Sequence, residues 1–571
     1  MNPRVIYIIR FFFILLLVQP AFSGVADNSV KKTTQARQGM VVSSEPNASQ
    51  AGIEILKQGG NSIDAAVAVG FALAVTHPQA GNIGGGGFMV IRMADGTTTT
   101  FDYREKAPAK SAKDMFLDDK GNYVPEKSQE GYLACGVPGS VAGMLLAHEK
   151  FGILNRAQVL QPAIKLATKG FKVSAPFARD LNAAFENYGK YQATGKFCSN
   201  DGKPYKEGEI FVQPDLANTL IRIAKEGRDG FYKGETAKLI VAEMNRGGGL
   251  ISSDDLASYK AVERTPLRGS YRGYEIVSMG PPSSGGVLLI YMLNLLEKYD
   301  IAGLGFGSVE TISILTETMK LAYADRAEFL GDPDYFHVPI NTLLSKSYAD
   351  ERRKLIAPAS AKPSTAISHG TITQKEHEET THYSVIDRWG NSVSTTTTIN
   401  GWFGNGVVID GAGFFLNNEM DDFSAKPGVP NMFGVVGAEA NAVQPNKRML
   451  SSMTPTIVVK DQKPFLILGS PGGSTIITTV LQVLMNVVDY GMNIRQAVDA
   501  SRIHHQWLPD TLRYEQAAFS KDVAQELKRR GFILAERPGH QGRVETIMID
   551  PNNGLYLGVS DSRGPGLAVG Y

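Results

Sequence analysis

The feature that most constrains this chain is an abrupt change of pattern at residue 380. Residues 357–379 are rich in Ala, Pro, Ser, Thr, Lys and Glu, and they hold almost no large apolar side chains. Such a segment cannot bury enough surface to order itself, so it predicts an exposed, flexible linker. Directly after it, the Thr- and Val-rich runs Thr380–Ile386 and Ser392–Ile399 flank a turn-like Asp-Arg-Trp-Gly-Asn sequence. This pattern predicts a β-hairpin whose first residue is Thr380.

The rest of the chain predicts helices on both sides of a group of strands. Apolar residues at helical spacing predict four helices, over Ala48–Gln58, Ser62–Val75, Ser284–Tyr299 and Ser308–Leu330. A second hairpin is expected over Thr454–Val459 and Phe465–Leu468, followed by a glycine-rich turn and a helix from Ser474 toward Val488. The pattern lacks long repeats of strand, helix and parallel strand. It therefore favours an α+β fold in which sheets lie between layers of helices.

The N-terminus has the pattern of a secretory signal peptide. Two Arg residues precede the apolar run Phe11–Val18, and the small residues Ala21 and Ser23 stand at the −3 and −1 positions of a cut. We predict removal of residues 1–23 and a mature chain that is periplasmic or secreted. The alternative is an uncleaved membrane anchor, but the apolar run is shorter than the ~20 residues that span a bilayer. No later segment is long and apolar enough to span, so no stable membrane span is expected after signal removal.

The charge and cysteine counts exclude some classes of protein. The chain has 58 Lys and Arg residues against 57 Asp and Glu residues, so it carries no strong field that would attract nucleic acid. We expect no nucleic-acid partner. With only Cys135 and Cys198, the chain is not a disulfide scaffold. Two buried free thiols are the favoured interpretation, and a disulfide between them is the alternative.

Three motifs that could bind a metal or a phosphate fail on their spacing. His377 and His382 are five residues apart, whereas two zinc-binding His on one helical face are four apart. His504 and His505 are adjacent and cannot both face one site from a regular element, which favours a surface or structural role. Gly84–Gly87 is not followed by the Lys and Ser or Thr of a phosphate-binding loop, so close backbone packing is favoured. We therefore expect no metal site.

Thr380 would gain a chemical role if the peptide bond between Glu379 and Thr380 were cleaved. A Thr hydroxyl is a weak nucleophile at neutral pH and needs a base. A freed α-amino group, with a pKa of about 7.7 to 8.0, can act as that base on the same residue. The local pattern alone does not decide the matter, because Thr at a strand start also reflects ordinary β-propensity.

Several segments resemble the γ-glutamyltransferase family, and most closely its bacterial members. Thr380–Val385 is similar to the processing-site signature of that family. The other similar segments are Gly84–Phe88, Phe101–Pro108, Leu416–Phe423, Pro445–Arg448, Leu450–Met453 and Gly469–Ser474. Together they span the mature chain in the order expected of the family.

The resemblance implies a four-layer αββα sandwich of the N-terminal nucleophile hydrolase type. Self-cleavage would give a large subunit of residues 24–379 and a small catalytic subunit of residues 380–571, paired as a heterodimer in one sandwich. Thr380 would take the γ-glutamyl group from glutathione or another γ-glutamyl amide as an ester. Water or an acceptor amino acid or peptide would then release it. The chemistry needs no metal and no organic cofactor.

The catalytic roles of the family carry over to four residues of this chain. Thr380 would be the nucleophile, and Thr398 would orient its hydroxyl or amine. The backbone N–H groups of Gly472 and Gly473 would bind the oxyanion, at the start of the helix predicted from Ser474.

Six further residues would bind the two charged ends of an amino-acid head group. A guanidinium fork and two hydroxyls suit the α-carboxylate, whereas two acids and an amide suit the α-ammonium. The residues implied for the carboxylate are Arg104, Ser451 and Ser452. Those implied for the ammonium are Asn400, Glu419 and Asp422.

One departure from the family lies in residues 427–441, which resemble its lid loop. Phe433 stands where a Tyr is expected, so the hydroxyl that would bond toward Asn400 is missing. We expect a lid that covers the site but is less firmly latched. Two other functions stay open. A cephalosporin or glutaryl acylase of the same fold is disfavoured by Glu419 and Asp422, which would face a substrate without an α-ammonium. The other is a non-catalytic protein that binds glutamyl peptides.

Overall fold

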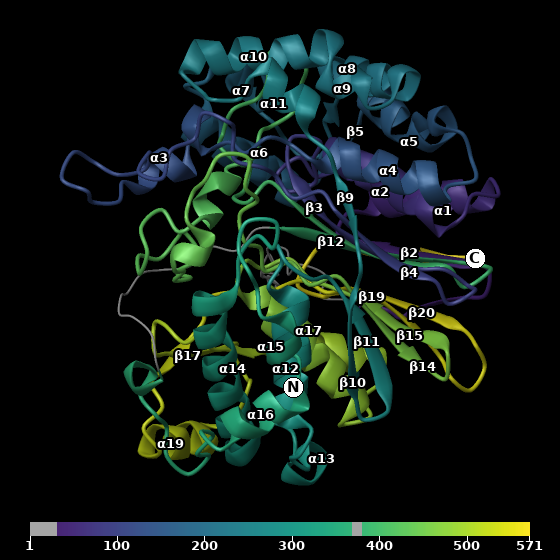
Figure 1. Ribbon diagram of the computed structural model, residues 1–571. Helices are drawn as coiled ribbons and strands as arrows, with labels where there is room; N and C mark the ends of the chain where they lie inside the picture. The colour runs from purple at the N-terminus through teal and green to yellow at the C-terminus, as the bar shows by residue number, and fades with distance from the viewer. Residues whose placement is uncertain (1–30, 368–379) are drawn as a thin grey trace, which may run out of the picture. The chain divides into compact units, whose positions relative to one another are not determined.

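Two antiparallel sheets of seven strands each, stacked on one another, form the centre of the fold (Figure 1). The computed structural model describes residues 31–367 and 380–571, and Lys32–Tyr571 form one unit. The signal peptide predicted over residues 1–23 lies outside the described residues, as does Glu379. No helix in the described part of the chain is long and apolar enough to cross a membrane.

Each sheet is named here after one of its central strands. The β12 sheet has the order β21 (Leu567–Gly570), β2 (Gly39–Ser43), β12 (Thr381–Asp387), β13 (Ser392–Thr398), β3 (Gly86–Arg92), β4 (Thr98–Asp102) and β9 (Val262–Arg264). The β14 sheet has the order β1 (Thr34–Ala36), β20 (Tyr556–Ser560), β19 (Glu545–Ile549), β15 (Lys463–Leu468), β14 (Thr456–Lys460), β11 (Tyr274–Ser278) and β10 (Leu267–Tyr271).

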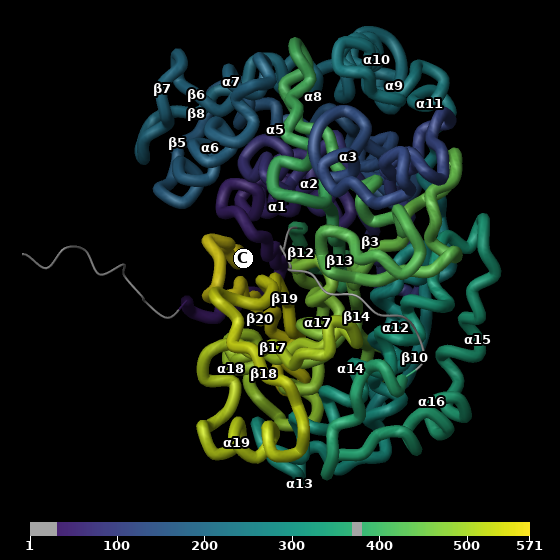
Figure 2. Tube along the Cα trace, turned by 90° about the vertical axis from the view of Figure 1, so that its left-hand side faces the viewer, coloured from purple at the N-terminus to yellow at the C-terminus, as the bar shows by residue number. Residues whose placement is uncertain are grey.

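Helices cover the outer face of each sheet, which gives four layers in the order helices, sheet, sheet, helices (Figures 1 and 2). The helices over the β12 sheet include α1 (Pro46–Lys57), α2 (Ser62–Thr76), α4 (Ser140–Phe151), α5 (Arg156–Lys169) and α8 (Pro214–Glu226). Those over the β14 sheet include α12 (Gly285–Leu296), α14 (Val309–Phe329) and α17 (Thr475–Val488). The four-layer αββα sandwich implied by the resemblance is confirmed.

Further helices extend the two outer layers. On the side of the β12 sheet they include α6 (Ala175–Tyr188), α7 (Gln192–Phe197), α10 (Gly234–Gly247) and α11 (Ser253–Ser258). On the other side they include α16 (Lys346–Arg353), α18 (Ile494–Asp499) and α19 (Lys521–Arg529).

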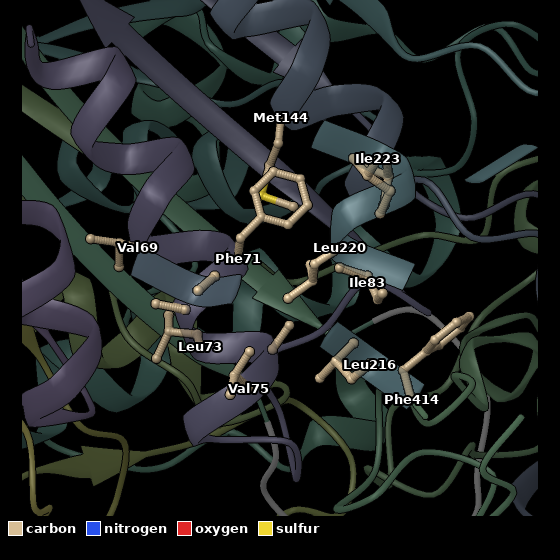
Figure 3. Close-up of a cluster of buried hydrophobic side chains, with 14 of the residues drawn as sticks. Val69, Phe71, Leu73, Val75, Ile83, Met144, Leu216, Leu220, Ile223 and Phe414 are labelled. Atoms are coloured by element: carbon tan, nitrogen blue, oxygen red, sulfur yellow. The ribbon is translucent and has the colours of Figure 1, made fainter. Parts of the chain in front are cut away.

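Helix α2 is apolar on all sides because it is buried on all sides. Each of its 15 residues is buried between the β12 sheet and the other helices of its layer. Its N-terminus is closed by a capping box, in which the Asn61 side chain accepts from the Asp64 N–H and the Asp64 side chain accepts from the Asn61 N–H. Figure 3 shows this cluster, with labelled side chains Val69, Phe71, Leu73 and Val75 of α2, Met144 of α4, and Leu216, Leu220 and Ile223 of α8.

Two apolar cores lie between the sheets and their helices, and a third lies between the two sheets. Alternate side chains of both sheets face it, as the period of two along a strand requires. It includes Met40, Val90 and Ile386 from the β12 sheet and Val277, Ile457 and Ile467 from the β14 sheet.

Strands from before and after residue 380 alternate in both sheets. In the β12 sheet, β12 and β13 lie between β2 and β3, and β21 pairs with the other edge of β2. In the β14 sheet, β14, β15, β19 and β20 lie between β11 and β1. A chain cut before Thr380 would therefore keep its two parts joined by backbone hydrogen bonds in both sheets.

The predicted hairpins and helices are confirmed. Both predicted hairpins are present, as β12–β13 and β14–β15, and the four predicted helices are α1, α2, α12 and α14. The first part of the predicted linker, residues 357–367, includes exposed positions, but two of its side chains are buried. There the Trp507 Nε1–H donates to the carbonyls of Ser364 (2.9 Å) and Ile367 (3.1 Å), and both residues are buried. A distant aromatic side chain supplies the apolar surface that this segment lacks. Residues 368–379 lie outside the described residues.

The close backbone packing predicted for Gly84–Gly87 is confirmed. A Cβ on Gly84 would lie 2.1 Å from the carbonyl oxygen of Phe415, and one on Gly85 would lie 2.1 Å from that of Thr398. Real Cβ atoms do not approach backbone oxygens this closely. The glycines therefore let β3 and the residues before it lie directly against the end of β13.

We predict that Gly85→Ala destabilises the protein by about 1–3 kcal/mol, because the new methyl group must push the Thr398 carbonyl aside. The midpoint of thermal unfolding should fall. Gly280→Ala is the control, since its Cβ would meet only the flexible side chain of Leu267, at 3.3 Å. An equal fall in both variants would contradict the prediction.

Candidate active site

Thr380 lies at the entrance to the central hairpin. It directly precedes β12, and its side chain is buried, with 4% exposed. In the antiparallel register Thr381 is opposite Thr397, so Thr380 and Thr398 are the next pair along the same two strands. The Thr398 Oγ1 accepts a hydrogen bond from the Asn400 N–H at 2.7 Å. The structure thus brings Thr380, Thr398 and Asn400 together at one end of the hairpin.

The glycine turn approaches this end of the hairpin from the β14 sheet. It runs from the end of β15 to the start of α17, and it begins at Gly469. A Cβ on Gly469 would lie 2.4 Å from the ring of His382, the second residue of β12. The turn is therefore packed against the strand that Thr380 precedes.

Gly472 and Gly473 adopt backbone conformations that other residues rarely take. Their φ angles are +134° and +51°, in the region that favours glycine. The Gly472 carbonyl accepts from both the N–H (2.9 Å) and the Oγ1–H (2.8 Å) of Thr475, so it is tied into the first turn of α17. Both glycines thus precede a 14-residue helix, whose N-terminal end carries positive potential that suits an oxyanion.

A buried cluster of charged side chains joins three distant segments. Arg104 follows β4, and its guanidinium forms ion pairs with Glu419 through Nη1 and with Asp422 through Nη2. The Arg104 Nε–H donates to the carbonyl oxygen of Met449 (3.2 Å), two residues before Ser451. Three of the predicted head-group residues therefore share one cluster, and the other end of the guanidinium lies against the segment that carries Ser451.

Ser451, Ser452 and Asn400 are held by hydrogen bonds in segments that adjoin this cluster. The Ser451 Oγ accepts from the Met453 N–H (3.1 Å), and the Ser452 Oγ accepts from the Arg326 Nη2–H (3.3 Å). Asn400 has a φ of +69°, and its Nδ2–H donates to the Asn418 carbonyl at 3.0 Å. Since Asn418 directly precedes Glu419, this bond ties the end of β13 to the acidic side of the cluster.

The acids in the cluster hold protons more tightly than usual. Burial raises the pKa of Asp422 to about 6, and the nearby Arg104 guanidinium opposes this shift. Burial also raises the pKa of Glu419 above its usual range. Glu105, whose pKa burial raises to about 7, lies 3.5 Å from Arg104 Nη1 and was not among the predicted site residues. The sequence feature that could have identified Glu105 was its position inside Phe101–Pro108, a segment that resembles the family.

The predicted lid loop covers the glycine turn. The Phe433 side chain is buried, and a Cβ on Gly473 would lie 2.6 Å from its ring, so the ring rests on that glycine. The loop is also bound to the charged cluster. The Asn431 Nδ2–H donates to Asp422 Oδ1 (3.1 Å), and the Met432 N–H donates to Asp421 Oδ2 (2.9 Å).

A second attachment of the lid comes from Gln506, which the sequence did not single out. Its Nε2–H group donates to the carbonyls of Phe433 (3.3 Å) and Gly434 (3.0 Å). Its Oε1 accepts from the Ser474 hydroxyl at 2.7 Å and lies 3.0 Å from His504 Nε2. Gln506 therefore links the lid backbone to the residue that precedes α17, and it does so without a hydroxyl on residue 433.

The remaining motifs lie apart from this chemistry. His382 is buried between Thr396 and Ser384, and burial lowers its pKa to about 3. His505 lies 3.3 Å from Asp510, which agrees with the structural role predicted for the His pair. His377 lies outside the described residues. The described part of the chain holds no group of three or more His, Cys, Asp or Glu that could bind a metal.

The two cysteines are buried free thiols, as the favoured interpretation predicted. The Cys135 Sγ accepts from the Asn405 Nδ2–H at 2.9 Å. Burial raises the pKa of both thiols above the usual range, so they are inert at neutral pH.

Two antiparallel sheets between layers of helices, with a threonine at the start of a central strand, are the arrangement of the N-terminal nucleophile hydrolases. The fold places the chain in this class. Comparison with known proteins gives the family. Residues 48–571 match the model of the gamma-glutamyltranspeptidase family, and the chain belongs to that family.

Individual relatives agree with this assignment. The chain is 51% identical to the glutathione hydrolase proenzyme of Escherichia coli (strain K12), over 97% of this chain and 95% of the relative. Among solved structures, it is similar to the cephalosporin acylase from Bacillus halodurans, with a TM-score of 0.85 and 29% identity over 97% of this chain and 99% of that one. The gamma-glutamyltranspeptidase of Helicobacter pylori matches with a TM-score of 0.57 and 48% identity, over 61% of this chain and 98% of that one.

We predict that Gln506→Leu loosens the lid, because the carbonyls of Phe433 and Gly434 lose their donor. Amide hydrogen exchange across residues 427–441 should become several-fold faster, as expected for about 1 kcal/mol per lost bond. Gln482→Leu is the matched control. Its Nε2–H group donates to two carbonyls near α17, those of Thr478 and Ile503, but to none in the lid. Unchanged lid exchange in Gln506→Leu, or equal changes in both variants, would contradict the assigned attachment.

Proposed function

We propose that this chain is a self-processing γ-glutamyltransferase and glutathione hydrolase whose nucleophile is Thr380. The observation that carries the proposal is the buried cluster of Arg104, Glu419 and Asp422 beside the hairpin that Thr380 opens. Such a cluster offers a cation to an α-carboxylate and two acids to an α-ammonium. A γ-glutamyl group carries both charges at the end remote from its reacting carbonyl.

The first step is cleavage before Thr380, which gives a subunit of residues 24–379 and one of residues 380–571. It exposes the Thr380 α-amino group, which then serves as the base for the hydroxyl of the same residue. The alternation of strands in both sheets supports a stable heterodimer of the two products. The name proenzyme, carried by the relative in Escherichia coli, also supports processing.

The second step is transfer of the γ-glutamyl group to Thr380. The hydroxyl oxygen attacks the γ-carbonyl, and its proton passes through the α-amino group to the leaving amine as the C–N bond breaks. The N–H groups of Gly472 and Gly473 stabilise the oxyanion formed during the attack. Removal of one such donor costs about 2.7–4 kcal/mol of transition-state stabilisation in enzymes of this kind. Thr398 positions the nucleophile from the facing strand.

The third step releases the γ-glutamyl group from the ester. Water gives glutamate, and the amine of an amino acid or peptide gives a new γ-glutamyl amide. In both cases the Thr380 oxygen regains a proton. No metal or organic cofactor takes part in the proposed sequence.

Head-group binding exchanges one set of ion pairs for another. The substrate α-carboxylate takes the place of an acid on Arg104, with Ser451 and Ser452 beside it. The α-ammonium then compensates Glu419 and Asp422, with Asn400 completing its contacts. An acylase acting on glutaryl amides is the second candidate, favoured by the similarity to the Bacillus halodurans cephalosporin acylase. The acids would stay unpaired with such a substrate, which favours the γ-glutamyl function.

We also propose that the chain is exported and acts in the periplasm or outside the cell. The pattern of residues 1–23, with two Arg residues before an apolar run and small residues at the cut, supports this location.

The proposal predicts that purified wild-type protein separates into two bands under denaturing conditions, the smaller one beginning at Thr380. Thr380→Ala should stay one chain and should not cleave a chromogenic γ-glutamyl anilide, because it lacks the attacking oxygen. Thr546→Ala is the control, since it removes a buried strand hydroxyl from the other sheet and should still be processed. A full-length wild-type chain, or a Thr380→Ala variant cut at the same bond, would overturn the mechanism. Cleavage of a glutaryl anilide in preference to the γ-glutamyl anilide would favour the acylase.

A pH dependence follows from the charge on Asp422. Since burial raises its pKa to about 6, the carboxyl is ionised above this pH and becomes neutral below it. The KM for a γ-glutamyl anilide should therefore rise below pH 6, by up to about tenfold per pH unit, as Asp422 becomes neutral. In Asp422→Asn the KM should be high already at neutral pH, and the further rise that is due to Asp422 should be lost. A wild-type KM that stays constant down to pH 5 would contradict the assigned role.

A further inference from the structure

A cavity of about 200 Å³ lies beside the glycine turn and is lined by Gly472, Trp402 and Arg543 among others. None of the six residues proposed to bind the amino-acid head group lines it. Its volume equals that of about six or seven water molecules in the liquid, which is enough for a large part of a dipeptide. The cavity thus touches the proposed oxyanion site and is separate from the head-group cluster.

The backbone of Arg543 is fixed to the glycine turn. Its N–H donates to the Ser470 Oγ at 3.0 Å, and Gly542 packs against Gly472. The Arg543 guanidinium lies over the Trp402 ring, 5.3 Å from its centroid. Trp402 follows Asn400 by two residues, so the aromatic support comes from the end of β13. Arg543 is therefore fixed by one contact with the glycine turn and another with the segment that follows β13.

The Arg543 guanidinium forms no direct ion pair with an acid. In the described ranges, 31–367 and 380–571, no carboxylate lies within 4 Å of its guanidinium. Burial raises the pKa of Asp180, and the Arg543 charge opposes this shift. Asp180 makes polar contacts with Gln79 (3.4 Å) and Arg179 (3.7 Å).

The other basic groups at the cavity differ from Arg543. Arg563 is paired with Glu515 (2.6 Å) and Asp561 (3.1 Å), so its charge is already satisfied. His540 is mostly exposed and lies 3.9 Å from Glu515. His77 does not line the cavity but packs against Trp402, with ring centroids 5.7 Å apart, and it is kept neutral because burial lowers its pKa to about 3. Arg543 is thus the Arg lining this cavity that has no carboxylate within 4 Å among the described residues.

We propose that Arg543 binds the free carboxylate of the peptide that leaves from, or attacks, the γ-glutamyl carbonyl. This inference rests on the proposed function. With the head group at Arg104 and the carbonyl oxygen at Gly472, the rest of the donor must occupy space that touches Gly472 and avoids the head-group cluster. The cavity meets both conditions. Its preferred occupant is a short peptide with an ionised C-terminus, the cysteinylglycine part of glutathione being one example.

The first test needs no variant. The processed wild-type enzyme is given glutathione and, separately, glutathione whose glycine carboxylate is replaced by a carboxamide. The kcat/KM for the acid should exceed that for the amide by roughly tenfold or more, the range that one charge-assisted hydrogen bond supports. Equal values for the two donors would overturn the inference. Failure to cleave either donor would instead overturn the proposed function.

Variants then assign the preference to Arg543. In Arg543→Gln the ratio of kcat/KM for acid over amide should fall to about one, and Arg543→Lys should keep part of it because it keeps the charge. Arg388→Gln is the matched control. Arg388 also lies over a Trp ring, that of Trp389 at 4.3 Å, but in the β12–β13 turn and outside the cavity. The ratio should keep its wild-type value in this control. A ratio that stays at the wild-type value in Arg543→Gln would contradict the inference, even if both rates fell.

Discussion

Backbone hydrogen bonds on both edges of β12 fix the position of Thr380. The strand pairs with β13 on one side and with β2 on the other, and a slip of one residue would send every side chain to the opposite face. Each face is buried, one against α2 and the other against the β14 sheet, so a slip would break both cores. The distance from Thr380 to Thr398 is thus set by the sheet as a whole. The same strand also fixes the position of the glycine turn, because Gly469 packs on His382.

The charged cluster illustrates why polar groups are kept in such a core. A buried ion pair is weak evidence of stability, since desolvation offsets much of the attraction, but removing one partner costs several kcal/mol. Arg104, Glu419 and Asp422 come from segments more than 300 residues apart, and their mutual attraction holds these segments together when no ligand is bound. In the proposed function the same groups exchange partners with a zwitterion. Selectivity for both charges would then arise because a ligand that carries only one of them would leave part of the cluster uncompensated.

The sequence predicted the parts of this structure that local pattern or family likeness determines. The hairpin at Thr380 follows from runs rich in Thr and Val on either side of a turn, and the buried helix α2 from a run of apolar residues. Arg104, Glu419 and Asp422 were available from motifs. Gln506 was not, because a lone Gln gives no signal and its partner carbonyls lie more than 70 residues away. The packing of Ser364 and Ile367 on Trp507 was missed for the same reason, since composition describes a segment and not its distant neighbour.

The alternation of strands on either side of residue 380 has a consequence for how a mature molecule persists. Before the cut, folding is unimolecular, and the linker keeps both partners of each strand pair at high effective concentration. After the cut, refolding would require two incomplete sheets from separate chains to meet, so its rate would depend on protein concentration. Neither product has an intact sheet of its own. The lifetime of the proposed processed form would then be governed by its rate of unfolding more than by equilibrium stability.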